Sequence, residues 1–254
     1  MMMTDKGQVT IFVIVAMVIV FAIFFLFLIN KKDVSLREQD FDDITGYISN
    51  CLTERSNLII EKMLDGGGFL NSNDTILYEN NFVTYLCKNI NNFEACVNQY
   101  PNYIKDVEDE FEKNIFGDSK VCIESLKQEL TNRGYEFNSK DYIIEAKLKE
   151  GIVEVSLNGD FYMAKDETTK KFSEFNILIR SSLMGLSTIA NEIVSQEARW
   201  CYFSNEGFMT LYPEYDIRVY MMEDTTKIYT IKDKRNGEKL KMATLGCALP
   251  AGLL

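Results

Sequence analysis

The sequence predicts an α+β protein with one N-terminal transmembrane helix, a helical region, and then an antiparallel sheet with a covering helix. An uncharged apolar run occupies residues 9–29, and apolar residues recur at three- and four-residue steps over residues 36–135. Apolar and polar residues alternate in short segments over residues 141–254. A polar head of residues 1–8 precedes the anchor, and we expect the two regions after it to form one compact domain.

The apolar run between Val9 and Ile29 has the length and composition of a membrane-spanning helix. Its 21 residues carry no charge and one hydroxyl group, that of Thr10. At about 1.5 Å of rise per residue, such a helix crosses a hydrocarbon core about 30 Å thick. The run is apolar on every face, whereas a surface helix of a soluble fold carries a polar stripe. A lipid bilayer is therefore the first partner that we predict.

The residues that enter this run resemble the opening of a group of uncharacterised archaeal surface proteins with an N-terminal membrane anchor. Residues 6–12 read Lys-Gly-Gln-Val-Thr-Ile-Phe. The same proteins are similar to this chain at Cys51, at the glycine cluster of residues 66–68, at the paired mid-chain cysteines and at residues 246–253. The resemblance implies an anchored surface protein, and it implies no particular activity.

The same junction also resembles the leader of type IV prepilins, which are cut after a glycine that precedes a long apolar helix. Gly7 and Gln8 are the candidate processing junction in this chain. Pilins of that family carry a glutamate at the fifth mature position, whereas Phe12 stands there in this sequence. We therefore expect a permanent anchor, with a processed pilin-like subunit as the alternative.

Six cysteines favour disulfide bonds in an exported domain. They are Cys51, Cys87, Cys96, Cys122, Cys201 and Cys247. The chain has no CxxC pair and no histidine, so we expect neither a metal nor a cofactor. Buried reduced thiols are the alternative. We expect Cys87 to pair with Cys96 across a polar, turn-rich segment, and a bridge from Cys201 to Cys247 would tie a helix end to the last strand.

Charge excludes one class of partner and leaves the orientation in the membrane open. Residues 1–37 carry four basic and two acidic side chains, so the remainder of this −11 chain carries −13 and does not suit a nucleic acid. Lysines that follow the anchor favour a cytoplasmic domain under the positive-inside rule. The cysteines, the resemblance and a sequon at Asn73, a candidate glycosylation site, favour the outside. We expect an extracytoplasmic domain.

The helical region divides at glycines and at residues that favour helix starts. We expect a helix over residues 36–64 that stops at the glycine cluster, because no Lys-Ser/Thr follows to make a phosphate loop. A short element over residues 81–89 precedes two helices, which start near Pro101 and Ser119. The acidic face of the first consists of Glu108, Asp109, Glu110 and Glu112. We interpret it as a solvated face rather than a calcium site.

The antiparallel region contains two groups of strands around one helix. In the first group we expect turns at residues 150–151 and at Asn158-Gly159, a strong hairpin signal, with a further strand near Ile177. A helix over residues 181–197 is expected to cover one face of that sheet. The second group follows, with a hairpin turn at Asn236-Gly237.

No nucleophile motif is present, so we assign no catalytic residue. Glu145 and Glu154 are the carboxylate pair that a glycosidase would need, and we interpret them as surface charges paired with Lys147 and Lys149. The sequence therefore favours a single-pass, extracytoplasmic surface protein with a structural, adhesive or partner-binding role. Its partners would be envelope proteins or other copies of itself. The alternatives are a pilin-like filament subunit cleaved after Gly7 and a membrane-tethered hydrolase.

Overall fold

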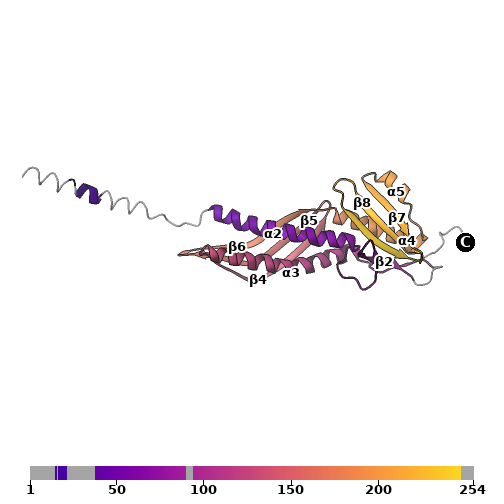
Figure 1. Cartoon of the computed structure of the whole chain (residues 1–254), viewed down its shortest axis with the longest axis horizontal. Coiled ribbons are helices and arrows are strands. Elements are labelled where there is room, and N and C mark those ends of the chain that lie inside the picture. The colour runs from indigo at the N-terminus through magenta and orange to yellow at the C-terminus, as the bar shows by residue number, and fades with distance from the viewer. Residues whose placement is uncertain (1–14, 16, 22–37, 90–93, 247–254) are drawn as a thin grey trace, which may run out of the picture. The chain divides into compact units, whose positions relative to one another are not determined.

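A computed structural model describes residues 15, 17–21, 38–89 and 94–246 of the chain (Figure 1). Val15 and residues 17–21 are helical, and their side chains are between 50% and 68% exposed. Among the described residues, no helix has both the length and the apolar character needed to cross a bilayer. Most of the expected anchor, together with Gly7 and Gln8, lies outside the described residues.

The described residues from Phe41 onward form one compact unit of α+β class, with helices and both antiparallel and mixed sheets. Its helices are α2 (Glu38–Asp65), α3 (Tyr103–Asn132), α4 (Leu183–Trp200) and α5 (Asn205–Leu211). Its strands are β1 (Thr75–Tyr78), β2 (Asn81–Lys88), β3 (Val97–Asn98), β4 (Glu136–Lys149), β5 (Ile152–Lys165), β6 (Thr168–Arg180), β7 (Tyr215–Met221), β8 (Lys227–Asp233) and β9 (Lys239–Leu245).

Helix α2 matches its expected range and ends at the glycine cluster. Gly67 and Gly68 have φ angles of 76° and 91°, which residues with a Cβ rarely adopt. A Cβ on Gly68 would also lie 2.7 Å from Val107 of α3. The cluster therefore stops the helix and allows the chain to pass close to α3, as the helix-stop interpretation predicted.

Helix α3 is continuous, so the prediction of two helices that meet near Ser119 was wrong. Ser119 is fully buried, and its hydroxyl donates to the carbonyl of Phe116 three residues earlier, as a side chain inside a helix does. Gly117 also lies inside this helix, and no atom lies within 4 Å of the position that a Cβ on it would take. The helix ends at the expected place, with Gly134 at φ 79°.

Strands β4, β5 and β6 form an antiparallel meander, and α2 and α3 lie along one of its faces (Figure 1). The prediction of a hairpin turn at Asn158-Gly159 was wrong, because both residues lie inside β5. The β4–β5 and β5–β6 registers shift next to them, which marks a β-bulge. A Cβ on Gly159 would lie 2.5 Å from the Cβ of Tyr142, so the glycine serves close strand approach rather than a turn.

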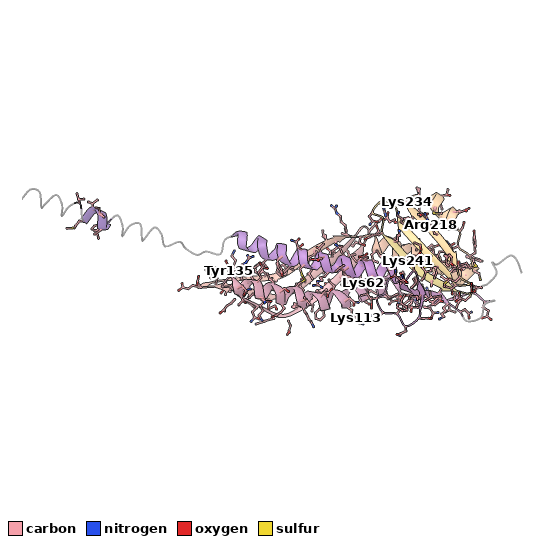
Figure 2. The ribbon with its side chains drawn as sticks, in the orientation of Figure 1. Lys62, Lys113, Tyr135, Arg218, Lys234 and Lys241 are labelled. Carbon is pink, nitrogen blue, oxygen red and sulfur yellow. A yellow bond between two sulfur atoms is a disulfide. The ribbon has the colours of Figure 1, made fainter. Side chains whose placement is uncertain are left out.

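The larger sheet joins the two halves of the sequence. Its strand order is β1-β2-β9-β8-β7, β3 pairs with β2, and β2 runs parallel to β9. The sheet curves enough to bring the rings of Tyr78 on β1 and Tyr220 on β7 to a centroid separation of 5.5 Å. Lys241 of β9, labelled in Figure 2, pairs with Asp65 and Glu79 at 3.2 Å each and so ties this sheet to the end of α2.

Helix α4 begins and ends close to its expected limits but covers a different surface. It packs mainly on β8 and β9 of the larger sheet and also touches β4 and β5. The expectation that it covers the meander was therefore wrong in its main contact. The reason is that α2 and α3 already cover one face of the meander, so the apolar face of α4 packs on the larger sheet instead.

Disulfides hold the helical layer and one end of the larger sheet. Cys51 of α2 is bonded to Cys122 of α3, and Cys87 of β2 is bonded to Cys96, which confirms the second pairing as predicted. Cys201 is also disulfide-bonded, and no described cysteine carries a free thiol. Cys247, its expected partner, lies outside the described residues.

Candidate functional site

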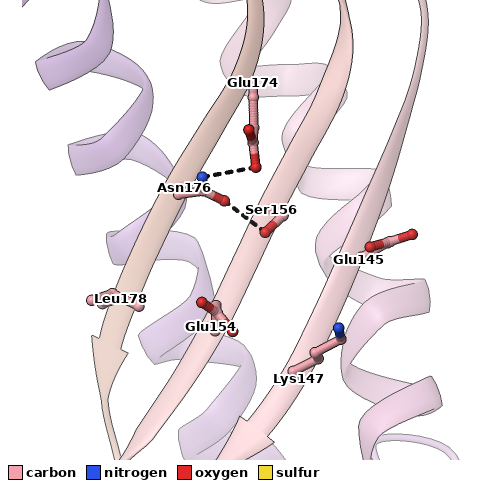
Figure 3. Close-up of a pocket in the computed structure, with 7 residues that line it drawn as sticks. All are labelled: Glu145, Lys147, Glu154, Ser156, Glu174, Asn176 and Leu178. Atoms are coloured by element: carbon pink, nitrogen blue, oxygen red, sulfur yellow. Dashed lines mark hydrogen bonds between the residues drawn. The ribbon is translucent and has the colours of Figure 1, made fainter.

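The exposed face of the meander is the surface on which the sequence placed its only pair of candidate carboxylates. We call it the outer face, and Figure 3 shows it with the helices behind the strands. A shallow hollow of about 410 Å³ lies on it. The hollow is lined by Glu145, Lys147, Glu154, Ser156, Glu174, Asn176 and Leu178.

Glu145 and Glu154 do not stand opposite one another across the strands. The register places Glu145 opposite Ser156 and Glu154 opposite Lys147. Glu154 forms an ion pair of 2.5 Å with Lys149, and the hydrogen bond from this ammonium lowers the pKa of its carboxyl. A glycosidase acid needs a raised pKa. The pairing of Glu154 thus agrees with the prediction of surface charge pairing.

The other side of the hollow carries a short chain of hydrogen bonds. Ser156 donates its hydroxyl to the amide oxygen of Asn176 at 2.7 Å, and Asn176 donates its amide nitrogen to Glu174 at 2.8 Å. Both bonds run between exposed or half-exposed groups, as the dashed lines in Figure 3 show. These two hydrogen bonds fix the orientation of the polar side chains of Asn176 and Glu174 on β6, next to the edge of the sheet.

The acidic residues of α3 are not simply solvated, so that prediction was wrong in part. Glu108 accepts a hydrogen bond from the backbone N–H of Leu148 at 3.0 Å, and Glu112 accepts one from that of Ala146 at 3.0 Å. The two glutamates are one helical turn apart, and the two N–H groups are two strand residues apart, so the spacings match. Carboxylates from α3 therefore cover the free edge of β4. The only signal for this role in the sequence is the four-residue spacing of the two glutamates.

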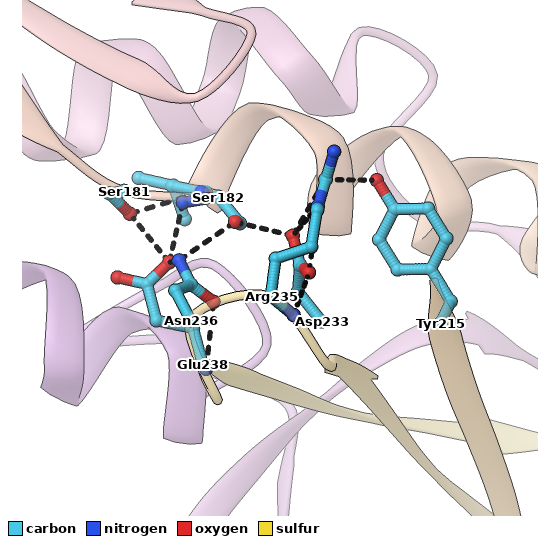
Figure 4. A network of polar contacts seen from close by, with 8 residues as sticks. Ser181, Ser182, Tyr215, Asp233, Arg235, Asn236 and Glu238 are labelled. Atoms are coloured by element: carbon cyan, nitrogen blue, oxygen red, sulfur yellow. Dashed lines mark hydrogen bonds and ion pairs between the residues drawn. The ribbon is translucent and has the colours of Figure 1, made fainter. Parts of the chain in front are cut away.

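A second polar cluster holds the start of α4 to the β8–β9 turn (Figure 4). Glu238 accepts hydrogen bonds from the backbone N–H of Ser182 at 2.5 Å, the hydroxyl of Ser181 at 3.2 Å and the amide of Asn236 at 2.9 Å. The N–H of Ser182 is one of the groups that the start of a helix leaves without an intrahelical partner, and the carboxylate satisfies it. The carboxylate also lies at the positive end of the helix dipole. These contacts give Glu238 a structural task.

Asp233 and Arg235 complete this cluster. Asp233 is fully buried and accepts hydrogen bonds from the hydroxyl of Ser182 at 2.6 Å and from the guanidinium of Arg235 at 2.7 Å. The hydrogen bonds from Arg235 lower the pKa of Asp233 to about 2, against the effect of burial. Arg235 also reaches the hydroxyl of Tyr215 on β7 at 3.2 Å. The cluster therefore joins α4 to strands at the edge of the larger sheet.

A third polar cluster lies buried at the other end of α4. Glu197 is 2% exposed and accepts hydrogen bonds from Lys227 at 2.7 and 2.9 Å and from the hydroxyl of Tyr229. Lys227 also donates to the carbonyl of Cys201 at 3.0 Å. Burial and the charge of Glu197 raise the pKa of Tyr229. The sequence did contain a signal for this cluster, since Glu197 follows Ile193 at a four-residue step on the apolar face.

A groove of about 820 Å³ separates α4 from α5 and the start of β7. Apolar side chains that include Met184, Phe208 and Leu211 line it, and Glu150, Glu192 and Glu214 stand among them. Leu211 is 76% exposed. The groove combines an apolar floor with negative charge, which suits a positively charged segment with apolar anchors.

The remaining candidate residues occupy separate places. Asn73 is exposed in the segment between α2 and β1, where a glycan has room. Among the described residues, no group of three or more Asp, Glu, Cys or His side chains is placed to hold a metal ion. Comparisons of the chain with protein-family models, curated proteins and solved structures found no match.

Proposed function

We propose that this protein is a single-pass, membrane-anchored surface protein whose extracytoplasmic domain binds other proteins. The observation that carries the proposal is the pair of disulfides, Cys51–Cys122 and Cys87–Cys96, with no free thiol among the described cysteines. Disulfides of this structural kind persist in oxidising compartments and are rare in the cytosol. The exposed Asn73 and the acidic charge are consistent with such a location.

The anchor in this proposal is the apolar run between Val9 and Ile29. Its described part, Val15 and residues 17–21, is helical, and its side chains are all apolar. Lipid would cover these side chains. The polar clusters of the domain are engaged in contacts between its own elements, so the proposal assigns binding to its surfaces and no reaction to its carboxylates.

Membrane extraction tests the anchor. Membranes that contain the full chain are washed with alkaline carbonate, and a variant that lacks residues 9–29 is treated in parallel. We expect the full chain to stay in the membrane until detergent is added and the shortened chain to be found in the soluble fraction. Release of the full chain by carbonate alone would contradict the anchor.

The second candidate is a pilin-like subunit, because a neighbouring subunit could cover the exposed apolar side chains near Val15 in place of lipid. Cleavage between Gly7 and Gln8 would start the mature chain at Gln8. Mass spectrometry of the N-terminus of the native protein separates the two candidates. A chain that retains Gly7 supports the permanent anchor, and a chain that starts at Gln8 supports the filament subunit.

A further inference from the structure

The two edges of the meander differ in how their backbone groups are satisfied. The N–H groups of Ala146 and Leu148 point away from β5, because they donate to Glu112 and Glu108 on α3. This observation fixes the direction of the backbone groups in residues 142–149, 152–158 and 174–180, where neither ladder shifts register, since residues opposite one another in an antiparallel ladder both face each other or both face away.

The same alternation sets the direction of the backbone groups of β6. Ala146 lies opposite Val155, so the backbone groups of Val155 point toward β6, and the groups of its partner Ile177 point back toward β5. The groups of Asn176 and Leu178, on either side of Ile177, therefore point outward from the sheet. The backbone N–H of Ser181 donates inward to Gly151, which is the direction that this alternation requires.

The outward edge of β6 is open where that of β4 is covered. We call the segment of residues 174–180 the β6 edge. The outward-pointing groups belong to Glu174, Asn176, Leu178 and Arg180, and among the described residues nothing forms a backbone hydrogen bond with them. Their side chains are all exposed, and Leu178 is 62% exposed. An exposed strand edge of this kind is a template for pairing with another strand.

We propose that the β6 edge binds the β6 edge of a second copy of the chain, antiparallel, about a two-fold axis at Ile177. In this register Asn176 lies opposite Leu178 of the second copy, and Glu174 lies opposite its Arg180. The symmetry produces two such Glu–Arg pairs, and opposite charges placed across antiparallel strands stabilise the pairing. The product is one continuous sheet of six strands, three from each copy.

Neighbouring registers match the charges less well. An axis at Phe175 places Arg180 opposite Lys170 of the second copy, which brings like charges together. An axis at Asn176 places Glu174 opposite Leu178 and leaves Arg180 opposite Phe172. Charge complementarity therefore selects both the occupant and the register. The inference deepens the proposed function by naming the partner, although the strand pairing itself does not depend on the membrane anchor.

Charge reversal tests the pairing with the full chain in detergent solution. The variants are Glu174→Arg, Arg180→Glu and the double variant, and association is measured by analytical ultracentrifugation over a concentration series. We expect each single variant to weaken association by about tenfold, because it makes two repulsive pairs, and the double variant to restore it. Circular dichroism checks that the variants stay folded. A wild-type chain that stays monomeric, or single variants that associate like wild type, would overturn the proposal.

Cysteine cross-linking tests the register and gives a second readout. Asn176→Cys and Leu178→Cys chains are purified separately, mixed in equal amounts and oxidised mildly. We expect a covalent dimer in the mixture and little in either variant alone, because residue 176 faces residue 178 of the second copy. Efficient cross-linking of Asn176→Cys alone, or none in the mixture, would overturn the register. A monomeric chain that still resists carbonate extraction would refute this inference and leave the proposed function standing.

Discussion

Glu197 lies at the end of α4 with Lys227 and Tyr229 as its hydrogen-bond partners. The side chains of Glu197 and Lys227 are 2% and 12% exposed. Removal of the carboxylate leaves an ammonium group buried without its counter-charge, and the loss of one partner of a buried pair costs more than the pair contributes. Single residues of this kind fix α4 on the larger sheet.

We predict that Glu197→Ala lowers the free energy of unfolding by about 3–5 kcal/mol. Urea denaturation followed by circular dichroism measures the change. Glu192→Ala is the matched control, because Glu192 lies on the exposed side of the same helix and its loss should change stability by less than about 0.5 kcal/mol. Equal effects of the two substitutions would show that the buried pair does not hold α4 in place.

Asp233 gives a prediction about acid stability. Its pKa falls from an ordinary value of 3.8 to about 2 in the folded protein, chiefly through Arg235. The lowered pKa means that its contribution is complete above about pH 4 and disappears as the pH falls through about 2. At neutral pH we expect Asp233→Asn to destabilise the fold by about 2 kcal/mol.

The pH dependence separates this charge effect from a loss of packing. Unfolding of wild type and of Asp233→Asn is compared at pH 7, 4 and 2. The difference between them should shrink toward pH 2, where Asp233 begins to take up a proton in the folded protein. A difference that stays constant from pH 7 to pH 2 would contradict the role of the ionised carboxylate.

At the scale of elements, the glycines at the two wrongly predicted boundaries, near Ser119 and at Asn158-Gly159, have opposite surroundings. Gly117 lies in the continuous helix α3 with open space around it, whereas Gly159 lies at a bulge against Tyr142. A single sequence cannot show this, because a glycine inside a helix or strand and a glycine at the boundary of an element can have the same kinds of neighbours along the chain. The difference depends on what packs nearby.

We predict that Gly117→Ala raises the free energy of unfolding by about 0.5–1 kcal/mol, because alanine favours a helix interior. Gly159→Ala should lower it by about 1–3 kcal/mol, because the new Cβ would overlap Tyr142. Thermal unfolding of both variants shows whether each substitution raises or lowers the stability of the fold. A destabilising Gly117→Ala would indicate that α3 breaks there, as the two-helix prediction supposed.

The Cys51–Cys122 disulfide joins the two long helices across 71 residues of sequence. By loop-closure entropy such a link contributes about 4 kcal/mol, compared with about 3 kcal/mol for Cys87–Cys96, which spans 9 residues. We predict that the double substitution of Cys51 and Cys122 by serine lowers the melting temperature more than that of Cys87 and Cys96. The reverse order would show that strain or local packing, rather than chain length, decides the contribution of each bond.

At the scale of the whole molecule, the sequence predicted elements better than their pairing. The range of α2, the helix stop at Gly66, the strands of the second group and the Cys87–Cys96 bond follow from local patterns. The parallel pairing of β2 with β9 could not be predicted, because residues far apart in sequence make it and neither strand carries a local mark of its neighbour. The covered β4 edge also required the position of α3 in space.

For the candidate site too, the sequence predicted local features but not contacts between elements. Local alternation correctly placed Glu145 and Glu154 on the exposed side of the strands, with Glu154 paired to lysine. Which strand edge stays open depends on Glu108 and Glu112, which lie on another element. The binding surface that we propose is therefore a property of the assembled domain and not of any motif.

The central claim is that this domain stands outside the cell. Lys120, Lys171 and Lys239 are exposed on different elements of the domain, so an amine reagent can reach them in the folded protein. Intact cells are treated with a membrane-impermeant amine reagent, and the labelled lysines are identified by mass spectrometry beside those of a cytosolic control protein. The account predicts labelling of these lysines at the level seen in lysed cells, with the control unlabelled. Labelling that appears only after lysis would contradict it.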